Sequence, residues 1–177
     1  PITISYSSDL TADVPSLKET IKHNPGILCL SLVSYKSAYY YPMKALNNFA
    51  KEHNSIIIWD LSHAVGAIDI DLKQTDTLAA IGCTYKYLNG GPGAPGYLFA
   101  HKRHQSAANP ISGWMGHAAM FDFESVYRPA DGIRRFLTGT QSVLALSAVR
   151  SGLSVFENAP ISLLRQRSLN LTGDFIR

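Results

Sequence analysis

The stretch Ile56-Ile-Ile-Trp-Asp-Leu-Ser-His63 decides the fold class. Its first four residues are apolar and mostly β-branched, which is typical of a strand in a parallel sheet that is covered on both sides. An acidic residue and a histidine, Asp60 and His63, follow at the carboxyl end of this strand. In open α/β sheets, ligands bind beyond the carboxyl ends of the strands. These two side chains are therefore the first candidates for a functional site.

Short apolar runs and amphipathic segments alternate along the rest of the chain. The expected elements are helix Val14–His23, strand Ile27–Val33, helix Met43–His53, strand Leu78–Ile81 and strand Tyr97–Ala100. Gly113–Thr140 has no clear period and is expected to form long functional loops. From Val143 onward the pattern is helical, with a break at Pro160 before a second helix. This order predicts an α/β fold with a mostly parallel sheet and helices on both faces.

Composition excludes several classes of protein. Apolar and aromatic residues make up 46% of the 177 residues, charged residues make up 16%, and the net charge is +3. This content rules out intrinsic disorder, and no apolar run is long enough to span a membrane. The positive charge is spread thinly, so a nucleic-acid partner has no support. Two cysteines, Cys29 and Cys83, are too few for a disulfide scaffold and favour a cytoplasmic protein, and the histidines lack the spacing of metal ligands.

Lys86 is the next candidate, in the stretch Thr84-Tyr-Lys-Tyr-Leu-Asn-Gly-Gly-Pro-Gly93 that follows a predicted strand. A buried lysine loses its proton more readily and becomes a nucleophile that can form a Schiff base. The alternative is a lysine that extends into solvent from the end of a strand. For Asp60 and His63, the alternative is an N-cap aspartate with a histidine packed beside it.

Two further positions could bind an anion. Trp114 lies in the stretch Gly113-Trp-Met-Gly-His117, and an indole N–H can donate to a phosphate oxygen. Thr140 precedes the helix that begins at Val143, where hydroxyls and backbone N–H groups can hold an anion. The alternatives are a tryptophan that anchors a loop on the core and ordinary N-capping.

Taken together, these motifs resemble the kynureninase family, which consists of pyridoxal-phosphate enzymes of fold type I, the aspartate aminotransferase-like superfamily. The resemblance covers about Asp9 to Asn158, in family order and at family-like spacing. The stretches that carry it are Ser31-Leu-Val-Ser-Tyr-Lys-Ser37, Trp59-Asp-Leu-Ser-His-Ala-Val-Gly-Ala67, Gly82-Cys-Thr-Tyr-Lys-Tyr-Leu-Asn-Gly-Gly-Pro-Gly-Ala-Pro95, Gly113-Trp-Met-Gly-His117 and Tyr127-Arg-Pro129. The run from Tyr85 to Gly93 is the most specific of them.

The resemblance implies a role for each candidate residue. Lys86 would carry pyridoxal 5′-phosphate as a covalent Schiff base and would act as the general base. The cofactor-binding residues would be Asp60 at the pyridinium nitrogen, His63 in the hydrogen-bonding shell of the ring, Tyr85 at the phosphate, and Trp114 and Thr140, which would reach the phosphate from the partner subunit of a homodimer.

The reaction that the resemblance implies is hydrolysis of L-kynurenine, or its 3-hydroxy form, to anthranilate, or 3-hydroxyanthranilate, and L-alanine. Such an enzyme would be a hydrolase of carbon–carbon bonds in tryptophan catabolism by the kynurenine pathway and in NAD biosynthesis. Its small-molecule substrate would bind at the subunit interface of a cytoplasmic homodimer.

The sequence also departs from the family. Ser34-Tyr-Lys-Ser-Ala38 replaces the more typical Asn-Tyr-Arg-Thr-Gly, and the change to Lys36 removes a bidentate donor. The flanking parts of a fold type I enzyme are not represented, so we expect an interior piece, incomplete at both ends. Residues 1–150 would be the central part of the large cofactor-binding domain, and residues 151–177 a helix leading toward a small C-terminal domain. Such a piece would be inactive alone, whereas the full-length parent would be active.

Two other functions are open alternatives. Cysteine desulfurases and related class V aminotransferases share the strand layout, but they typically carry glutamine where His63 stands and histidine where Tyr85 stands. The other alternative is a non-catalytic structural remnant that kept this fold and lost its pockets. A plain dinucleotide-binding domain is disfavoured, because the sequence lacks the glycine fingerprint of that fold.

Overall fold

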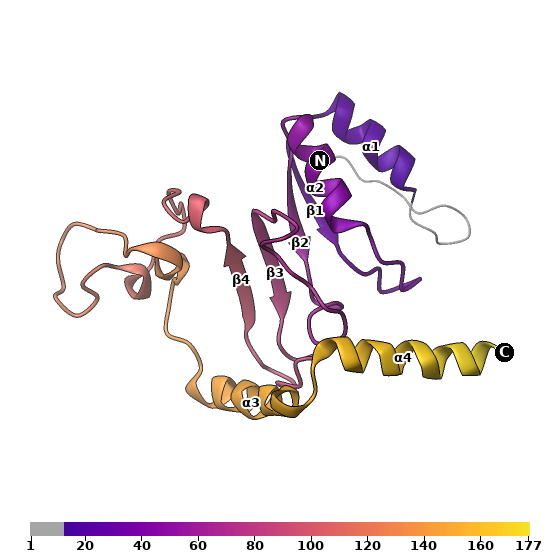
Figure 1. The fold of residues 1–177 in the computed structure, drawn as a ribbon. Helices are drawn as coiled ribbons and strands as arrows, with labels where there is room; N and C mark the ends of the chain where they lie inside the picture. Colours follow the sequence, from indigo (N-terminus) through magenta and orange to yellow (C-terminus); the bar gives the residue numbers. More distant parts are fainter. Residues whose placement is uncertain (1–12) are drawn as a thin grey trace.

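A single four-stranded sheet organises the computed structural model, which describes residues 13–177. The strands are β1 (Ile27–Ser31), β2 (Ile56–Asp60), β3 (Ala79–Cys83) and β4 (Gly96–Ala100), and they lie side by side in this order (Figure 1). The β1–β2 and β2–β3 pairs are parallel, whereas β4 runs antiparallel to β3. Residues 84–95 contain no helix that could return the chain to the opposite end of the sheet, as a parallel connection usually requires. The predicted α/β fold with a mostly parallel sheet is confirmed.

The helices begin and end close to the predicted positions. They are α1 (Val14–His23), α2 (Met43–Glu52), α3 (Val143–Leu153) and α4 (Ile161–Ile176). Asp13 caps α1 by accepting a hydrogen bond from the Ser16 N–H at 2.9 Å, and Ser142 caps α3 in the same way. Pro160 separates α3 and its 3₁₀ extension from α4, as predicted. Between β4 and α3 the chain forms loops with short 3₁₀ turns, which confirms the predicted loop character of Gly113–Thr140.

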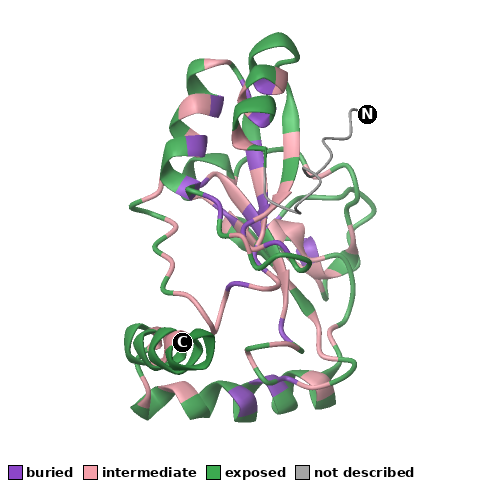
Figure 2. Ribbon diagram, turned by 90° about the vertical axis from the view of Figure 1, so that its right-hand side faces the viewer, coloured by how far each residue is buried: buried purple, intermediate pink, exposed green. Residues whose placement is uncertain are grey.

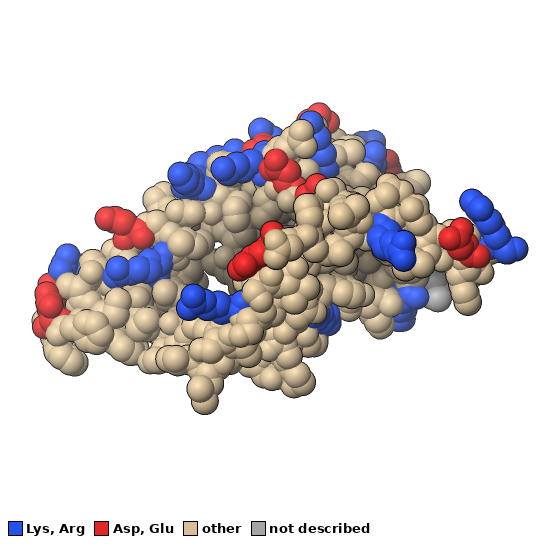
Figure 3. All heavy atoms as spheres, turned by 60° about the horizontal axis from the view of Figure 1, so that its bottom comes forward, with Lys and Arg blue, Asp and Glu red and all other residues tan. Residues whose placement is uncertain are grey.

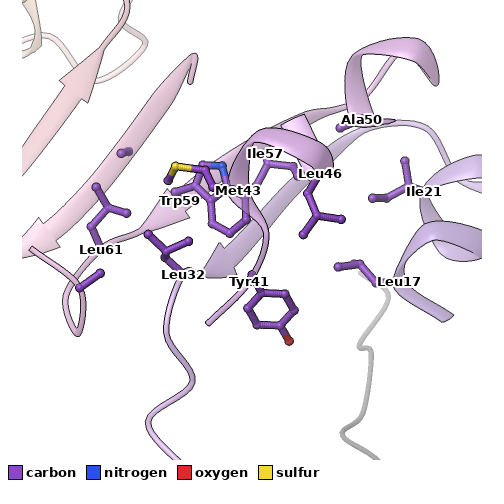
Figure 4. Packing of buried hydrophobic residues seen from close by; sticks show 12 residues of the cluster. Leu17, Ile21, Leu32, Tyr41, Met43, Leu46, Ala50, Ile57, Trp59 and Leu61 are labelled. Atoms are coloured by element: carbon purple, nitrogen blue, oxygen red, sulfur yellow. The ribbon is translucent and has the colours of Figure 1, made fainter. Parts of the chain in front are cut away.

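The core lies between one face of the sheet and helices α1 and α2 (Figure 4). Ile57 and Trp59 of β2 alternate with exposed or half-exposed neighbours and point to this side. Trp59 is completely buried, and its indole N–H donates to Asn47 Oδ1 at 2.8 Å. Each fully buried apolar side chain contributes about 1.5–3 kcal/mol. The helical members of the core are Leu17 and Ile21 of α1 and Met43, Leu46 and Ala50 of α2.

The opposite face of the sheet is more exposed. Ile27 is 74% exposed, and Ile56, Ile81 and Leu98 are exposed on the same side. Helices were predicted on both faces. Within residues 13–177, α1 and α2 cover one face, while α3 and α4 lie beside the carboxyl ends of β1–β3 (Figures 1 and 2). Both of these later helices are mostly exposed.

The predicted division of the chain stays a prediction. Its boundary, between residues 150 and 151, falls inside α3, and residues 1–12 of its first unit lie outside the described residues.

No helix within residues 13–177 is both long and apolar enough to span a membrane. On the face shown in Figure 3, basic and acidic side chains are interspersed and most of the surface is uncharged.

Candidate active site

Asp60 ends β2, and two hydrogen bonds hold its carboxylate. The Ser62 N–H donates to Oδ1 at 2.9 Å, and the Ser31 hydroxyl donates to Oδ2 at 3.3 Å. Burial alone would raise the pKa of Asp60, but the hydrogen bonds from Ser62 and Ser31 and the nearby Lys86 ammonium lower this pKa below its ordinary value. The carboxylate therefore stays ionised and can accept a hydrogen bond from a cationic N–H group. The residues after Asp60 form helical turns rather than a regular helix, and the hydrogen bond from the Ser62 N–H also fits the N-cap alternative.

His63 lies in the turn after β2, opposite Tyr35 in the loop after β1. The two rings are stacked, with centroids 6.4 Å apart and an interplanar angle of 27°. The ammonium of Lys36 lies 5.9 Å from the centroid of the Tyr35 ring. The loop after β1 thus brings an aromatic ring and a cation to the same edge of the sheet as Asp60.

Ser31 and Tyr35 also lie at this edge, although neither was predicted to be a site residue. Both belong to the run Ser31–Ser37 that carries the family resemblance. Ser31 stands opposite Asp60 in the parallel register of β1 and β2. A signal was therefore available, because the carboxyl ends of neighbouring parallel strands meet at one edge.

Lys86 lies in the loop that connects β3 and β4, at this same edge. Its side chain is partly exposed, and its ammonium lies 5.4 Å from the centroid of the Tyr85 ring. It is close enough to Asp60 to contribute to the lowered pKa of that carboxyl group. The structure therefore brings Asp60, Tyr85 and Lys86 to one edge of the sheet, with His63 in the turn beside them.

Backbone hydrogen bonds and positive φ angles fix the loop that carries Lys86. The Thr84 hydroxyl, which is buried, donates to the Pro95 carbonyl at 2.6 Å and closes the loop. The Gly90 N–H donates to the Thr84 carbonyl at 2.9 Å. Gly91 and Gly93 adopt φ angles of +75° and +81°, which L side chains rarely adopt. The prediction that these glycines supply a turn with positive φ is confirmed.

Tyr97 of β4 lies next to the site on the core side of the sheet. Its ring lies across Gly82, where a Cβ atom would overlap the phenol. Burial, together with the nearby Cys83 and Asp60, raises the pKa of Tyr97 to about 12. Its hydroxyl is buried and has no hydrogen-bond partner among residues 13–177. This phenol is a neutral neighbour of the site.

Trp114 and Thr140 belong to a second group, apart from Lys86. The 3₁₀ turns η2 (Trp114–Gly116) and η3 (Gly132–Phe136) pack together, and Gly116 permits this because a Cβ atom there would lie 2.5 Å from the Leu137 carbonyl oxygen. These residues form a lobe that projects beyond β4, away from the carboxyl ends of β1–β3 (Figure 1). Thr140 is exposed on the segment that leads from the lobe to α3.

Residues 113–138 make up this lobe, which we call the Trp114 lobe. His117 organises the loop next to Trp114. Its Nδ1 accepts a hydrogen bond from the Ala119 N–H at 3.0 Å, which places the proton of the neutral ring on Nε2. Nε2 lies 3.6 Å from Glu124 Oε2. Glu124 accepts two hydrogen bonds from Arg128, at 2.7 and 2.5 Å, which lower the pKa of Glu124. Polar contacts thus set the shape of the lobe.

Apolar side chains of the Trp114 lobe are exposed. Trp114 is 48% exposed and packs only edge-on against Phe121, with ring centroids 6.0 Å apart. Phe123 is 90% exposed, and Phe121 and Val126 are exposed as well. Several large exposed apolar side chains on one lobe are typical of an interface. No cluster of three or more metal-ligating side chains occurs in the described part of the chain.

Comparisons with known proteins point to one family. The family model "Aminotransferase class-V" matches residues 3–174. The kynureninase of Pseudomonas fluorescens is 40% identical over 172 residues, and that of Burkholderia pseudomallei (strain K96243) is 37% identical over the same length. Each match covers 97% of this chain and 41% of the relative, so the chain spans about two fifths of the length of these relatives.

Solved structures show the same fold. The cysteine desulfurase of Thermococcus onnurineus NA1 superposes with a TM-score of 0.72 over 92% of this chain and 40% of its own, at 18% identity. The cysteine desulfurase CsdA of Escherichia coli gives a TM-score of 0.71 over 89% of this chain and 39% of its own, at 19% identity. The predicted resemblance to the kynureninases is confirmed by the sequence relatives, and the chain belongs to the class V aminotransferase family.

Proposed function

We propose that this chain carries the Lys86 half of a pyridoxal-phosphate active site that hydrolyses L-kynurenine or 3-hydroxykynurenine. The observation that carries the proposal is the ionised Asp60 carboxylate, which accepts hydrogen bonds from Ser31 and Ser62. It lies at the same edge of the sheet as the Lys86 amine. The choice of substrate is supported by the kynureninases that are 37–40% identical to this chain. The products would be anthranilate, or 3-hydroxyanthranilate, and L-alanine.

Pyridoxal phosphate fits the residues at this edge. A protonated pyridine nitrogen needs an ionised carboxylate, and Asp60 is held in that form. The aldehyde needs a primary amine, which Lys86 supplies, and the phosphate needs donors such as the hydroxyl of the half-exposed Tyr85. When bound, the cofactor supplies an electron sink for negative charge that develops at the α-carbon of the substrate.

Each of the site residues in this chain would then have a defined role. Asp60 would accept the pyridine N–H and orient the ring, and Ser31 would keep the carboxylate in place. His63, in its stack with Tyr35, would lie in the hydrogen-bonding shell of the ring. Lys86 would hold the cofactor covalently and, once the amino group of the substrate displaces it, would take up the α-proton on Nζ.

The Trp114 lobe supports a homodimer with shared active sites. Trp114 lies apart from Lys86 in the same chain, and its lobe exposes Phe121, Phe123 and Val126. A second subunit that covers this apolar surface could receive Trp114 and Thr140 at its own phosphate site. The active site would then lie at the subunit interface.

The proposed reaction would place the parent enzyme, a carbon–carbon bond hydrolase, in tryptophan catabolism and NAD biosynthesis. Cys29 and Cys83 are free thiols, which suits the reducing cytoplasm. The chain alone would be inactive, because Asp60 and Lys86 lie at the carboxyl edge of the sheet, whereas the Trp114 lobe projects beyond β4 (Figure 1).

The first test measures the reaction of the full-length protein with pyridoxal phosphate added. We expect release of anthranilate from L-kynurenine, and loss of this activity in Lys86→Ala and Asp60→Asn. Formation of L-alanine and sulfide from L-cysteine in the presence of dithiothreitol, without release of anthranilate from kynurenine, would favour the cysteine desulfurase alternative. No turnover, together with no visible absorption of bound cofactor in the wild type or in Lys86→Ala, would favour the structural remnant.

The second test measures complementation between two defective variants. Lys86→Ala and Trp114→Ala subunits are mixed, dissociated and reassociated. If the site is shared, mixed dimers contain one site with both Lys86 and Trp114, and activity returns. If each subunit uses its own Trp114, no activity above that of the separate variants appears.

A further inference from the structure

Helix α3 has a single buried stripe, and this stripe faces the loop that carries Lys86. Ala145, Val149 and Gly152 are its less exposed positions, at spacings of four and three residues that place them on one side of the helix, and Phe156 of the 3₁₀ extension that follows α3 is also partly buried. Val149 and Gly152 are the fully buried members. The remaining positions of α3 are exposed, so the stripe is its main contact with the described part of the chain.

Gly152 allows direct contact between α3 and the backbone of the loop. A Cβ atom at Gly152 would lie 2.7 Å from the carbonyl oxygens of Leu88 and Asn89. Real Cβ atoms do not approach backbone oxygens so closely, and a carbonyl cannot rotate away as a flexible side chain can. One helical turn earlier, Val149 contacts Gly90, where a Cβ atom would lie 2.9 Å from Val149 Cγ2.

The opposite side of the loop is held by the turn that follows Asp60. Gly66 has a φ angle of +89°, and a Cβ atom there would lie 2.6 Å from the Tyr87 carbonyl oxygen. The residues that directly follow Lys86 are therefore enclosed between the turn that follows Asp60 and α3. No flexible side chain intervenes at either contact that could absorb a displacement.

We propose that Gly152 is a positioning residue. Because it has no side chain, the backbone of Leu88 and Asn89 lies directly against α3, and this contact fixes the position of Lys86 relative to Asp60. α3 continues through a 3₁₀ turn into α4, so a displacement of these helices would move the Lys86 loop. The inference deepens the proposed function, because it rests on the role of Lys86 in holding the cofactor. The contact itself does not depend on that role.

The experiment compares the same substitution at two helical glycines. Gly173 of α4 has no described atom within 4 Å of the position of its missing Cβ, so Gly173→Ala should stabilise the helix and leave the loop unchanged. Gly152→Ala gains the same helix propensity but must displace the loop. Hydrogen exchange of the full-length protein is measured by mass spectrometry for peptides that cover residues 84–95 and 56–60.

We expect Gly152→Ala to speed exchange in residues 84–95 by about tenfold, with residues 56–60 unchanged, as for local opening. Unchanged exchange in residues 84–95 would overturn the inference. Val149→Ala is the second variant in case Gly152→Ala does not fold. It should loosen the same peptide to a smaller extent, and an unchanged peptide would again overturn the inference.

A spectroscopic readout separates positioning from folding. The pH midpoint of the visible absorption of bound pyridoxal phosphate should shift by about half a unit in Gly152→Ala, a roughly threefold change in the proton equilibrium, and stay fixed in Gly173→Ala. A midpoint that stays fixed in both variants would overturn the positioning role. If the wild type shows no absorption, the proposed function fails, whereas the exchange result still tests the contact.

Discussion

The carboxyl edge of the sheet and the Trp114 lobe both carry candidate site residues, but they are built in different ways. Asp60 directly follows the completely buried Trp59, so the packed core fixes its position. Trp114 is 48% exposed and depends on polar contacts around His117. The comparison teaches that the packed core of this chain fixes the residues at the carboxyl edge, whereas the Trp114 lobe exposes apolar side chains that the proposed homodimer would cover.

The largest expected effect separates the two tryptophans. Trp59→Ala removes a buried side chain of the core and should lower the free energy of unfolding by about 3–5 kcal/mol. Trp114→Ala removes a half-exposed side chain and should change it by less than about 0.5 kcal/mol. Urea unfolding of both variants measures the difference. Equal destabilisation would contradict the distinction between the two regions.

The next effect concerns the polar contacts of the lobe. His117→Ala leaves the Ala119 N–H without its acceptor and should cost about 1–3 kcal/mol of local stability. We expect chymotrypsin to cut at Phe121 and Phe123 faster than in the wild type. His117→Asn is the control, because its amide oxygen can replace Nδ1 as the acceptor. Unchanged cleavage in His117→Ala would show that other contacts hold the lobe.

A smaller effect is expected at the amino edge of the sheet. There the Asp76 carboxylate forms ion pairs with the Arg103 guanidinium at 2.7 Å and the Lys51 ammonium at 3.2 Å. Hydrogen bonds from Arg103 and Lys51 lower the pKa of Asp76 from 3.8 to about 2. Because the folded pKa is depressed, the stabilisation is fully present above pH 3.8 and is lost as the pH falls toward 2.

Asp76→Asn should therefore lower stability at neutral pH by about 1 kcal/mol or less, since the carboxylate is partly exposed. Asparagine tolerates the left-handed backbone of this position, where φ is +52°. Urea unfolding as a function of pH should show that the difference from the wild type shrinks as the pH falls toward 2 and disappears below it. A difference that persists there would mean that the substitution acts through something other than the charge.

The smallest effect is a gain in stability at Ala38, in the loop after β1. Ala38 has a φ angle of +57°. The family that the sequence resembles typically carries glycine at this position. Ala38→Gly relieves this strain at some cost in unfolded-state entropy, so we expect a net gain of about 0.5 kcal/mol. A thermal melt checks this, and a lower melting temperature would show that the left-handed backbone costs little.

The sequence predicted the carboxyl edge better than the lobe, for physical reasons. Asp60 and Lys86 follow strands, and the periodicity of the strands places both residues at one edge. The antiparallel direction of β4 was not predicted, because composition does not show whether the segment between β3 and β4 contains a crossover helix. Gly152 gave no signal either, since its role depends on the carbonyl groups of a distant loop. The place of Trp114 depends on tertiary contacts within its lobe that local patterns do not encode.

The central claim is that Lys86 holds pyridoxal phosphate at the edge defined by Asp60. The most direct measurement is borohydride reduction of the full-length protein with bound pyridoxal phosphate, followed by peptide mapping by mass spectrometry. The account predicts a phosphopyridoxyl group on Lys86, and loss of stable attachment in Lys86→Ala. Attachment to Lys36 or another lysine in the wild type, or no attachment, would contradict it.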